Sequence, residues 1–180
     1  MLPADRLDAE WLEADGLGGF ASGTVAGWRT RRYHGLLTPA VEVPSRRVVL
    51  VDGFETWIEQ GGTRTALTAQ QYVPGVIHPD GHQRIVGFSP SPWPTWSWRL
   101  ESGLEVTQEV LVPHERPAAI VRWSCKGRSP GARLIVRPLL SGRDTHALHF
   151  ENPALRADAE VAGERVRWRP YDGLPTILSL

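Results

Sequence analysis

Short runs of alternating apolar and polar residues, broken by a turn signal roughly every ten residues, constrain the fold of this chain more than any other feature. Residues 54–59 alternate in this way, and the following Gln60-Gly61-Gly62-Thr63 is typical of a hairpin turn. The expected strands cover residues 46–52, 54–59, 64–72, 85–88, 96–100, 104–112, 117–125, 132–140, 155–161, 166–168 and 176–180. This series predicts an all-β antiparallel sandwich, although a barrel shares the same signals.

Two segments depart from this pattern. Residues 4–14 are expected to form one or two helical turns, with Leu7, Trp11 and Leu12 on one side. Residues 73–81 contain two prolines and two glycines, and we expect a loop there. No internal repeat or low-complexity linker divides the 180 residues, so the sequence predicts a single domain.

The eight tryptophans and the single cysteine are interpreted mainly as packing residues. Trp96 and Trp98 are expected on one buried strand face. Trp28 and Trp93 lie in expected turns, where an exposed ring could also provide an apolar surface for a sugar. Cys125 is expected to be a small core residue, and a lone cysteine excludes an intrachain disulfide.

The charge of the chain limits the classes of partner. Twenty basic and 20 acidic residues give a formal net charge of zero, which argues against a nucleic-acid or anionic-membrane surface. The N-terminus has no secretory signal pattern, and no apolar run approaches the roughly 20 residues that span a bilayer. We therefore expect a soluble, cytoplasmic protein with no nucleic-acid or membrane partner.

Several motifs of common chemistry are absent or incomplete. The GLGG at residues 16–19 has the wrong spacing for a dinucleotide or phosphate loop, and Ser22 lacks a nucleophile-elbow context, so we interpret it as a loop serine that caps its own backbone. Two histidine pairs have no obvious third ligand for zinc: His78 with His82, and His146 with His149. We expect no metal and no cofactor.

The densest polar clusters are residues 31–34 (RRYH) and residues 143–146 (RDTH). One interpretation is an ion-pair network that fixes loops, because buried arginine and aspartate need partners. The other is a polar rim that meets carbohydrate hydroxyls, which both donate and accept hydrogen bonds. The residues alone leave both interpretations open.

Three blocks of the sequence resemble a known family. Residues 10–37 read EWLEADGLGGFASGTVAGWRTRRYHGLL, and this stretch is similar to the signature of the N-terminal domain of bacterial and archaeal glycogen debranching enzymes. Residues 138–146 resemble a later family block, PLxxxRDxH, and residues 74–81 resemble a third. The three blocks occur in the family's order.

The resemblance implies a galactose-mutarotase-like β-sandwich over residues 1–180, followed in the family by a barrel of paired helices that hydrolyses α-1,6-linked glucose. It places no catalytic residue in this chain. It implies as partners an α-glucan and a C-terminal catalytic domain of the same polypeptide. The expected substrate-binding or domain-interface residues are Asp15, Arg31, Arg32, Tyr33, His34, Arg143, Asp144 and His146.

Three expectations accompany this reading. The two polar clusters should lie together, facing the catalytic domain. Asp15 stands where the family usually has asparagine, which removes an amide donor and adds a charge. The chain ends within an apolar, strand-like run, which suggests a fragment whose exposed edge strand invites self-association. A free-standing glucan-binding module and a purely structural domain are the alternatives.

Overall fold

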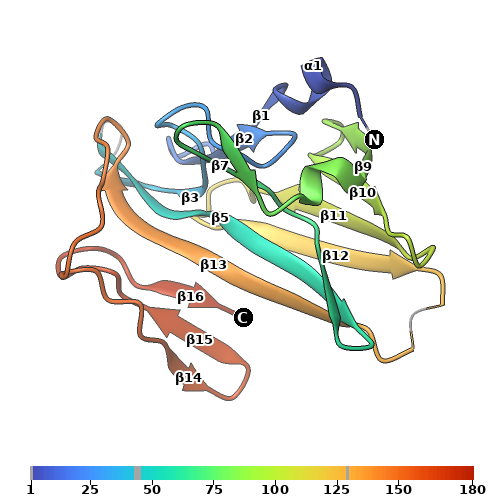
Figure 1. Cartoon of the computed structure of the whole chain (residues 1–180). Helices are drawn as coiled ribbons and strands as arrows, with labels where there is room; N and C mark the ends of the chain where they lie inside the picture. Colours follow the sequence, from blue (N-terminus) through green and yellow to red (C-terminus); the bar gives the residue numbers. More distant parts are fainter. Residues whose placement is uncertain (1, 43–45, 129) are drawn as a thin grey trace.

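The computed structural model describes residues 2–42, 46–128 and 130–180 (Figure 1). Its helical elements are α1 (Ala4–Leu7) and a 3-10 turn, η1 (Gly81–Arg84). The strands are β1 (Glu10–Ala14), β2 (Phe20–Thr24), β3 (Gly35–Thr38), β4 (Ala40–Glu42), β5 (Arg46–Gln60), β6 (Thr63–Ala66), β7 (Gln70–Tyr72), β8 (Val76–His78), β9 (Ile85–Ser89), β10 (Thr95–Arg99), β11 (Glu105–Leu111), β12 (Ile120–Lys126), β13 (Arg133–Asp144), β14 (Glu160–Ala162), β15 (Arg165–Trp168) and β16 (Ile177–Ser179).

The strands form antiparallel sheets, which confirms the all-β prediction. A seven-stranded sheet has the order β1-β2-β3-β5-β13, with β4 and β6 also paired to β5. A four-stranded sheet has the order β12-β11-β10-β9, and β14-β15-β16 and β7-β8 form smaller sheets. The long strands β5 and β13 run side by side (Figure 1). Among the described residues, each sheet has an open strand order and does not close into a barrel.

Tryptophan side chains join the two large sheets. Trp96 on β10 is buried, and its indole packs edge-on against Trp11 of β1 with the ring centroids 5.4 Å apart. Its Nε1 donates to the carbonyl oxygen of Val25 at 2.8 Å. Trp98, two residues on, is buried in the same core, as the strand period predicts. The two layers make an arrangement consistent with a β-sandwich, and the galactose-mutarotase-like subtype stays a prediction.

The N-terminal prediction was partly wrong. The helix ends at Leu7, and Glu10–Ala14 is strand β1, paired with β2 from Glu10↔Thr24 to Ala14↔Phe20. Leu12 is 61% exposed and does not share a buried face with Leu7. Pairing with the nearby strand β2 is therefore favoured over continuing the helix, because helix nucleation is unfavourable in so short a segment.

The expected strand over residues 64–72 is interrupted. Strand β6 ends at Ala66, and the next residues include the buried Leu67 and Ala69, with Leu67 1% exposed. The chain then forms β7, which pairs with β8 inside the segment expected to be a loop. The hairpin turn at Gln60–Thr63 is confirmed, because β5 and β6 pair on both sides of it.

Several smaller expectations are also corrected. Cys125 is exposed, because β12 is the edge strand of its sheet among the described residues. Trp28 is buried, and its Nε1 donates to Asp8 Oδ1 at 2.9 Å, so its ring does not provide an exposed apolar surface for a sugar. Ser22 lies in β2, where its Oγ donates to the carbonyl oxygen of Tyr33 at 3.1 Å. The expected turn at residues 126–131 includes Ser129, which lies outside the described residues.

Strand limits differ elsewhere as well. The predicted strand over residues 117–125 begins at Ile120, and the one over residues 132–140 continues to Asp144. Of residues 155–161, only the last two belong to β14, which pairs with β15 across the predicted hairpin. No helix among the described residues is long and apolar enough to cross a membrane.

Candidate functional site

Arg143 lies at the centre of the predicted polar site. It sits near the end of β13, opposite Val49 of β5, after two register shifts in that ladder. Its guanidinium is 8% exposed and donates to the carbonyl oxygens of Arg32 and, at 3.1 Å, His34. The same guanidinium pairs with Asp52 Oδ1 at 3.2 Å. One buried arginine therefore holds the loop of residues 31–34 against the end of β5.

Arg32, Tyr33 and His146 form an exposed patch over this buried arginine. Arg32 donates to the carbonyl oxygen of His146 at 2.9 Å. The Tyr33 hydroxyl lies 3.4 Å from His146 Nδ1, and the two rings meet edge-on with centroids 5.7 Å apart. The Arg32 guanidinium also lies 5.9 Å from the centre of the Tyr33 ring. We call Arg32, Tyr33 and His146 the rim.

The turn that carries His146 is fixed by its own sequence and by β5. Asp144 Oδ1 accepts the backbone N–H of His146 at 2.8 Å, which is the local bond that aspartate favours in turns. The buried Thr145 donates its N–H to the carbonyl oxygen of Arg47 at 3.2 Å. The Asp144 carboxylate thus orders the turn.

His34 lies behind the rim and is 3% exposed. The backbone N–H of Thr30 donates to its Nδ1 at 3.3 Å, so Nε2 carries the proton and faces Glu10 Oε1 at 3.5 Å. Burial lowers the pKa of His34, although the Glu10 carboxylate opposes that shift. The hydrogen bond from Arg31 lowers the pKa of Glu10. His34 is therefore a buried neutral imidazole.

Asp15 lies in a different local structure, the glycine-rich loop between β1 and β2. Its Oδ1 accepts the backbone N–H groups of Leu17 at 2.7 Å and Gly19 at 2.8 Å. Asp15 is 2% exposed. The loop is linked toward the polar site by Arg47, whose Nε donates to the carbonyl oxygen of Gly18. Asp15 is thus a buried loop-ordering residue and does not belong to the rim.

The structure therefore joins seven of the eight predicted residues and separates Asp15. Arg31 lies at the margin, with 63% of its side chain exposed and its Nε bonded to Glu10. Sequence reasoning missed Glu10, Arg47 and Asp52 as partners. Asp52 carried a visible signal, because it is a lone carboxylate that ends the apolar run of residues 48–51. The pairing of Arg47 with two distant loops has no such local signal.

The site has donors and acceptors but no pattern for metal binding. Among residues 2–42, 46–128 and 130–180, no group of three or more His, Cys, Asp or Glu side chains could hold a metal ion. The carboxylates nearest the rim, Asp52 and Asp144, bond to Arg143 and to a backbone N–H. The exposed groups are a guanidinium, a phenol and an imidazole, which suit a ligand with many hydroxyls or a second protein surface.

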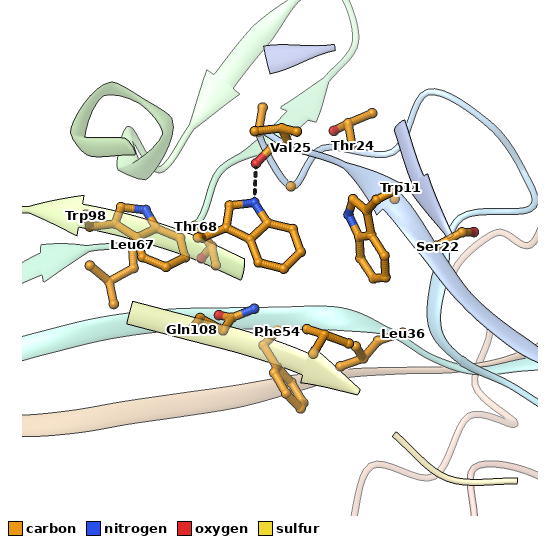
Figure 2. A pocket seen from close by; sticks show the side chains of 15 residues that line it. Trp11, Ser22, Thr24, Val25, Leu36, Phe54, Leu67, Thr68, Trp98 and Gln108 are labelled. Atoms are coloured by element: carbon orange, nitrogen blue, oxygen red, sulfur yellow. Dashed lines mark hydrogen bonds between the residues drawn. The ribbon is translucent and has the colours of Figure 1, made fainter. Parts of the chain in front are cut away.

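A small cavity lies between the sheets (Figure 2). Its volume is about 90 Å³, and Trp11, Trp98, Phe54 and Gln108 are among its lining residues. The Nε1 atoms of Trp11 and Trp98 are buried without a hydrogen-bond partner among the described residues. Pockets for small ligands start at about 300 Å³, so this cavity is too small for an ordinary small-molecule ligand.

Comparison with known families agrees with the sequence blocks. A family model described as the N-terminal part of glycogen debranching enzyme matches residues 9–179. The chain belongs to this family. Searches of curated proteins and of solved structures each gave no significant match. In this debranching-enzyme N-terminal domain, the matched range includes the glycine-rich loop, the rim and Arg143.

Proposed function

We propose that this domain supports a separate catalytic domain of a glycogen debranching enzyme and contributes to glucan binding through the rim. The family match over residues 9–179 carries the proposal. The exposed groups of Arg32, Tyr33 and His146 support it, because the buried Arg143 presents them on one surface. Sugar hydroxyls both donate and accept hydrogen bonds, so a guanidinium, a phenol and an imidazole can each bond to a neutral polyhydroxyl ligand.

The domain takes no catalytic role in this proposal. Glycoside hydrolysis uses two positioned carboxyl groups, one of which acts as an acid. Each carboxylate at the site is held by a partner: Asp52 by Arg143, Asp144 by the backbone N–H of His146, and Glu10 by Arg31. Hydrolysis of α-1,6 branches is therefore assigned to a C-terminal catalytic domain of the same polypeptide, acting in cytoplasmic glycogen breakdown.

The test compares residues 1–180 with the polypeptide encoded by the whole reading frame. We expect the longer polypeptide to release glucose from a branched limit dextrin, and residues 1–180 alone to release none. In the longer polypeptide, Tyr33→Ala should raise KM about tenfold, which corresponds to one lost ring contact. Tyr72→Ala is the matched control, because Tyr72 is a similarly exposed tyrosine on β7.

The alternatives give different results. If Tyr33→Ala lowers only the unfolding temperature and leaves KM unchanged, the rim is a structural brace. If the reading frame encodes no further domain and residues 1–180 bind maltoheptaose, the chain is a free-standing glucan-binding module. Either outcome contradicts the proposal as stated.

A further inference from the structure

A second, larger groove opens at the other end of β5. Its volume is about 570 Å³, within the range of about 300–1,000 Å³ that is usual for ligand pockets. Strand β6, the segment from His78 to Arg84 and the turn at residues 100–102 supply its walls. Three segments that are distant in the sequence thus converge on one hollow.

This groove is separate from the rim. The rim lies where Arg143 pairs with Val49, whereas the groove contains Trp57 and Ile58 of the same strand. Nine residues of extended chain separate Val49 from Ile58, which corresponds to about 30 Å. A ligand in the groove therefore makes no contact with Tyr33 or His146 unless it is a long polymer.

Trp57 lines one wall of the groove. Trp57 is half-buried, and the Arg137 guanidinium lies 5.4 Å from the centre of its ring. Arg137 also pairs with the buried Glu55. This pairing keeps the guanidinium close to the Trp57 indole, which limits the freedom of the ring.

Asp80 and Arg84 also line the groove, as a hydrogen-bonded pair of charges. Arg84 donates to both carboxylate oxygens of Asp80, at 2.7 and 3.0 Å. The hydrogen bonds from Arg84 lower the pKa of Asp80 and raise the pKa of Arg84, so both groups stay ionised. A planar two-bond pair presents donors and acceptors in a rigid geometry.

The charges of the lining residues balance. Arg64 and Arg84 are matched by Asp80 and Glu101, and His78 adds an imidazole. A phosphate or an acidic peptide needs a net positive wall, and a basic ligand needs a net negative one. The balance favours a neutral ligand that both donates and accepts hydrogen bonds and has an apolar face for an indole.

We propose that this groove binds a segment of neutral α-glucan, independently of the rim. The inference rests on the proposed function for the class of ligand, and adds a second point of attachment on the domain. Because the two sites lie at opposite ends of β5, one branched polymer can occupy both while a short oligosaccharide occupies either.

The experiment titrates residues 1–180 with maltoheptaose by calorimetry and follows the indole N–H signals by NMR. The titrations are made in a Tyr33→Ala background, which disables the rim. There we expect Trp57→Ala to weaken binding at least about tenfold, and Glu101→Gln to weaken it about threefold. Glu101 is exposed in a turn, so its variant tests the groove even if Trp57→Ala does not fold. Tyr72→Ala is the control and should leave the affinity unchanged.

The salt dependence of the binding affinity shows whether the groove recognises a neutral or a charged ligand. Binding of a neutral glucan should change little between about 50 mM and about 500 mM NaCl, because no net charge is screened. If maltoheptaose binds but neither groove variant weakens it, the groove proposal is overturned and the rim proposal survives. If no maltoheptaose binds at about 10 mM, an affinity weaker than about −3 kcal/mol, the groove proposal also fails, and the KM test of Tyr33→Ala decides the rim separately.

A protein occupant gives a different signature. Strand β6 lies beside the groove and pairs on one side with β5. In this case the NMR signals of the groove residues do not change when maltoheptaose is added, but they shift as the protein concentration rises. Sedimentation shows self-association over the same concentrations. β6 is then an edge to which a strand of a second copy is added. That result would overturn the glucan assignment.

Discussion

Arg143 shows why the two polar clusters lie together. Residues 31–34 and 143–146 are more than 100 positions apart, and neither cluster contains a complete set of partners. Arg143 is buried and pairs with the half-buried Asp52, so removing Asp52 would leave the guanidinium without its counter-charge. The sequence indicated that Arg143 and Asp144 need partners, and tertiary structure decided that Arg143 bonds to carbonyl oxygens while Asp144 bonds within its own turn.

Asp15 gives the first test at the residue scale. Asp15→Asn should change the free energy of unfolding by less than about 1 kcal/mol, because an amide oxygen can accept the same N–H groups of Leu17 and Gly19. Asp15→Ala should cost about 2 kcal/mol or more, because both N–H groups lose their acceptor. Urea unfolding followed by tryptophan fluorescence measures both changes. Equal costs for the two variants would show that the charge matters more than the acceptor.

His34 gives the second test. Burial lowers its pKa below the ordinary 6.5, so the unfolded state takes up a proton before the folded state does. Stability should therefore fall as the pH drops below about 6.5, and should be unaffected by His34 above it. Burial also lowers the pKa of His82, so His82 contributes to the pH dependence with the same sign. The lowered pKa of Glu10 affects stability only below about its ordinary pKa of 4.5, which is outside the pH range where His34 titrates.

The measurement is the free energy of unfolding between about pH 5 and about pH 7. His34→Gln should flatten part of the slope, because glutamine keeps a donor for Glu10 and does not titrate. His82→Gln should remove a further part. An unchanged slope in the double variant would assign the pH dependence to other groups.

At the scale of elements, β5 determines most of the organisation. This 15-residue strand pairs with β3, β4, β6 and β13, and both candidate sites lie along it. Its alternation was visible in the sequence, and so was the hairpin at Gln60–Thr63. The pairing of β7 with β8 was not, because three-residue strands give too little periodicity to separate a hairpin from a loop.

Gly81 gives a test of how η1 packs on the chain. A Cβ at Gly81 would overlap the backbone of Leu67 and Thr68, and the Gly81 N–H donates to the Thr68 carbonyl oxygen at 3.1 Å. Gly81→Ala should therefore cost about 3 kcal/mol, because the neighbour is backbone and cannot rotate away.

Gly53→Ala is the matched control for Gly81. A Cβ at Gly53 would meet only the end of the Arg29 side chain, at 3.8 Å. We expect it to be neutral or slightly stabilising, since alanine reduces the freedom of the unfolded chain. Chemical unfolding of both variants gives the comparison, and similar costs would contradict the packing of η1 described above.

At the scale of the whole molecule, Trp96 joins the two large sheets. Trp96→Ala should cost about 3–5 kcal/mol, because a buried indole is removed together with its bond to Val25. Trp93→Ala is the control, since Trp93 is half-buried in a turn and bonds to Glu109. Thermal unfolding should show a much larger loss for Trp96. Equal losses would mean that the sheets do not depend on this contact.

The sequence by itself determined the all-β class, the buried face of Trp96, Trp98 and Leu100, and the family, because strand period, turn chemistry and motif spacing are local properties. Tertiary structure alone decided which apolar residues are exposed to solvent. Cys125 has the pattern of a core residue, yet it is exposed because β12 has a neighbour on one side only among the described residues. It also decided the partners of Arg143 and separated Asp15 from the rim, because contacts between distant segments depend on how the sheets stack.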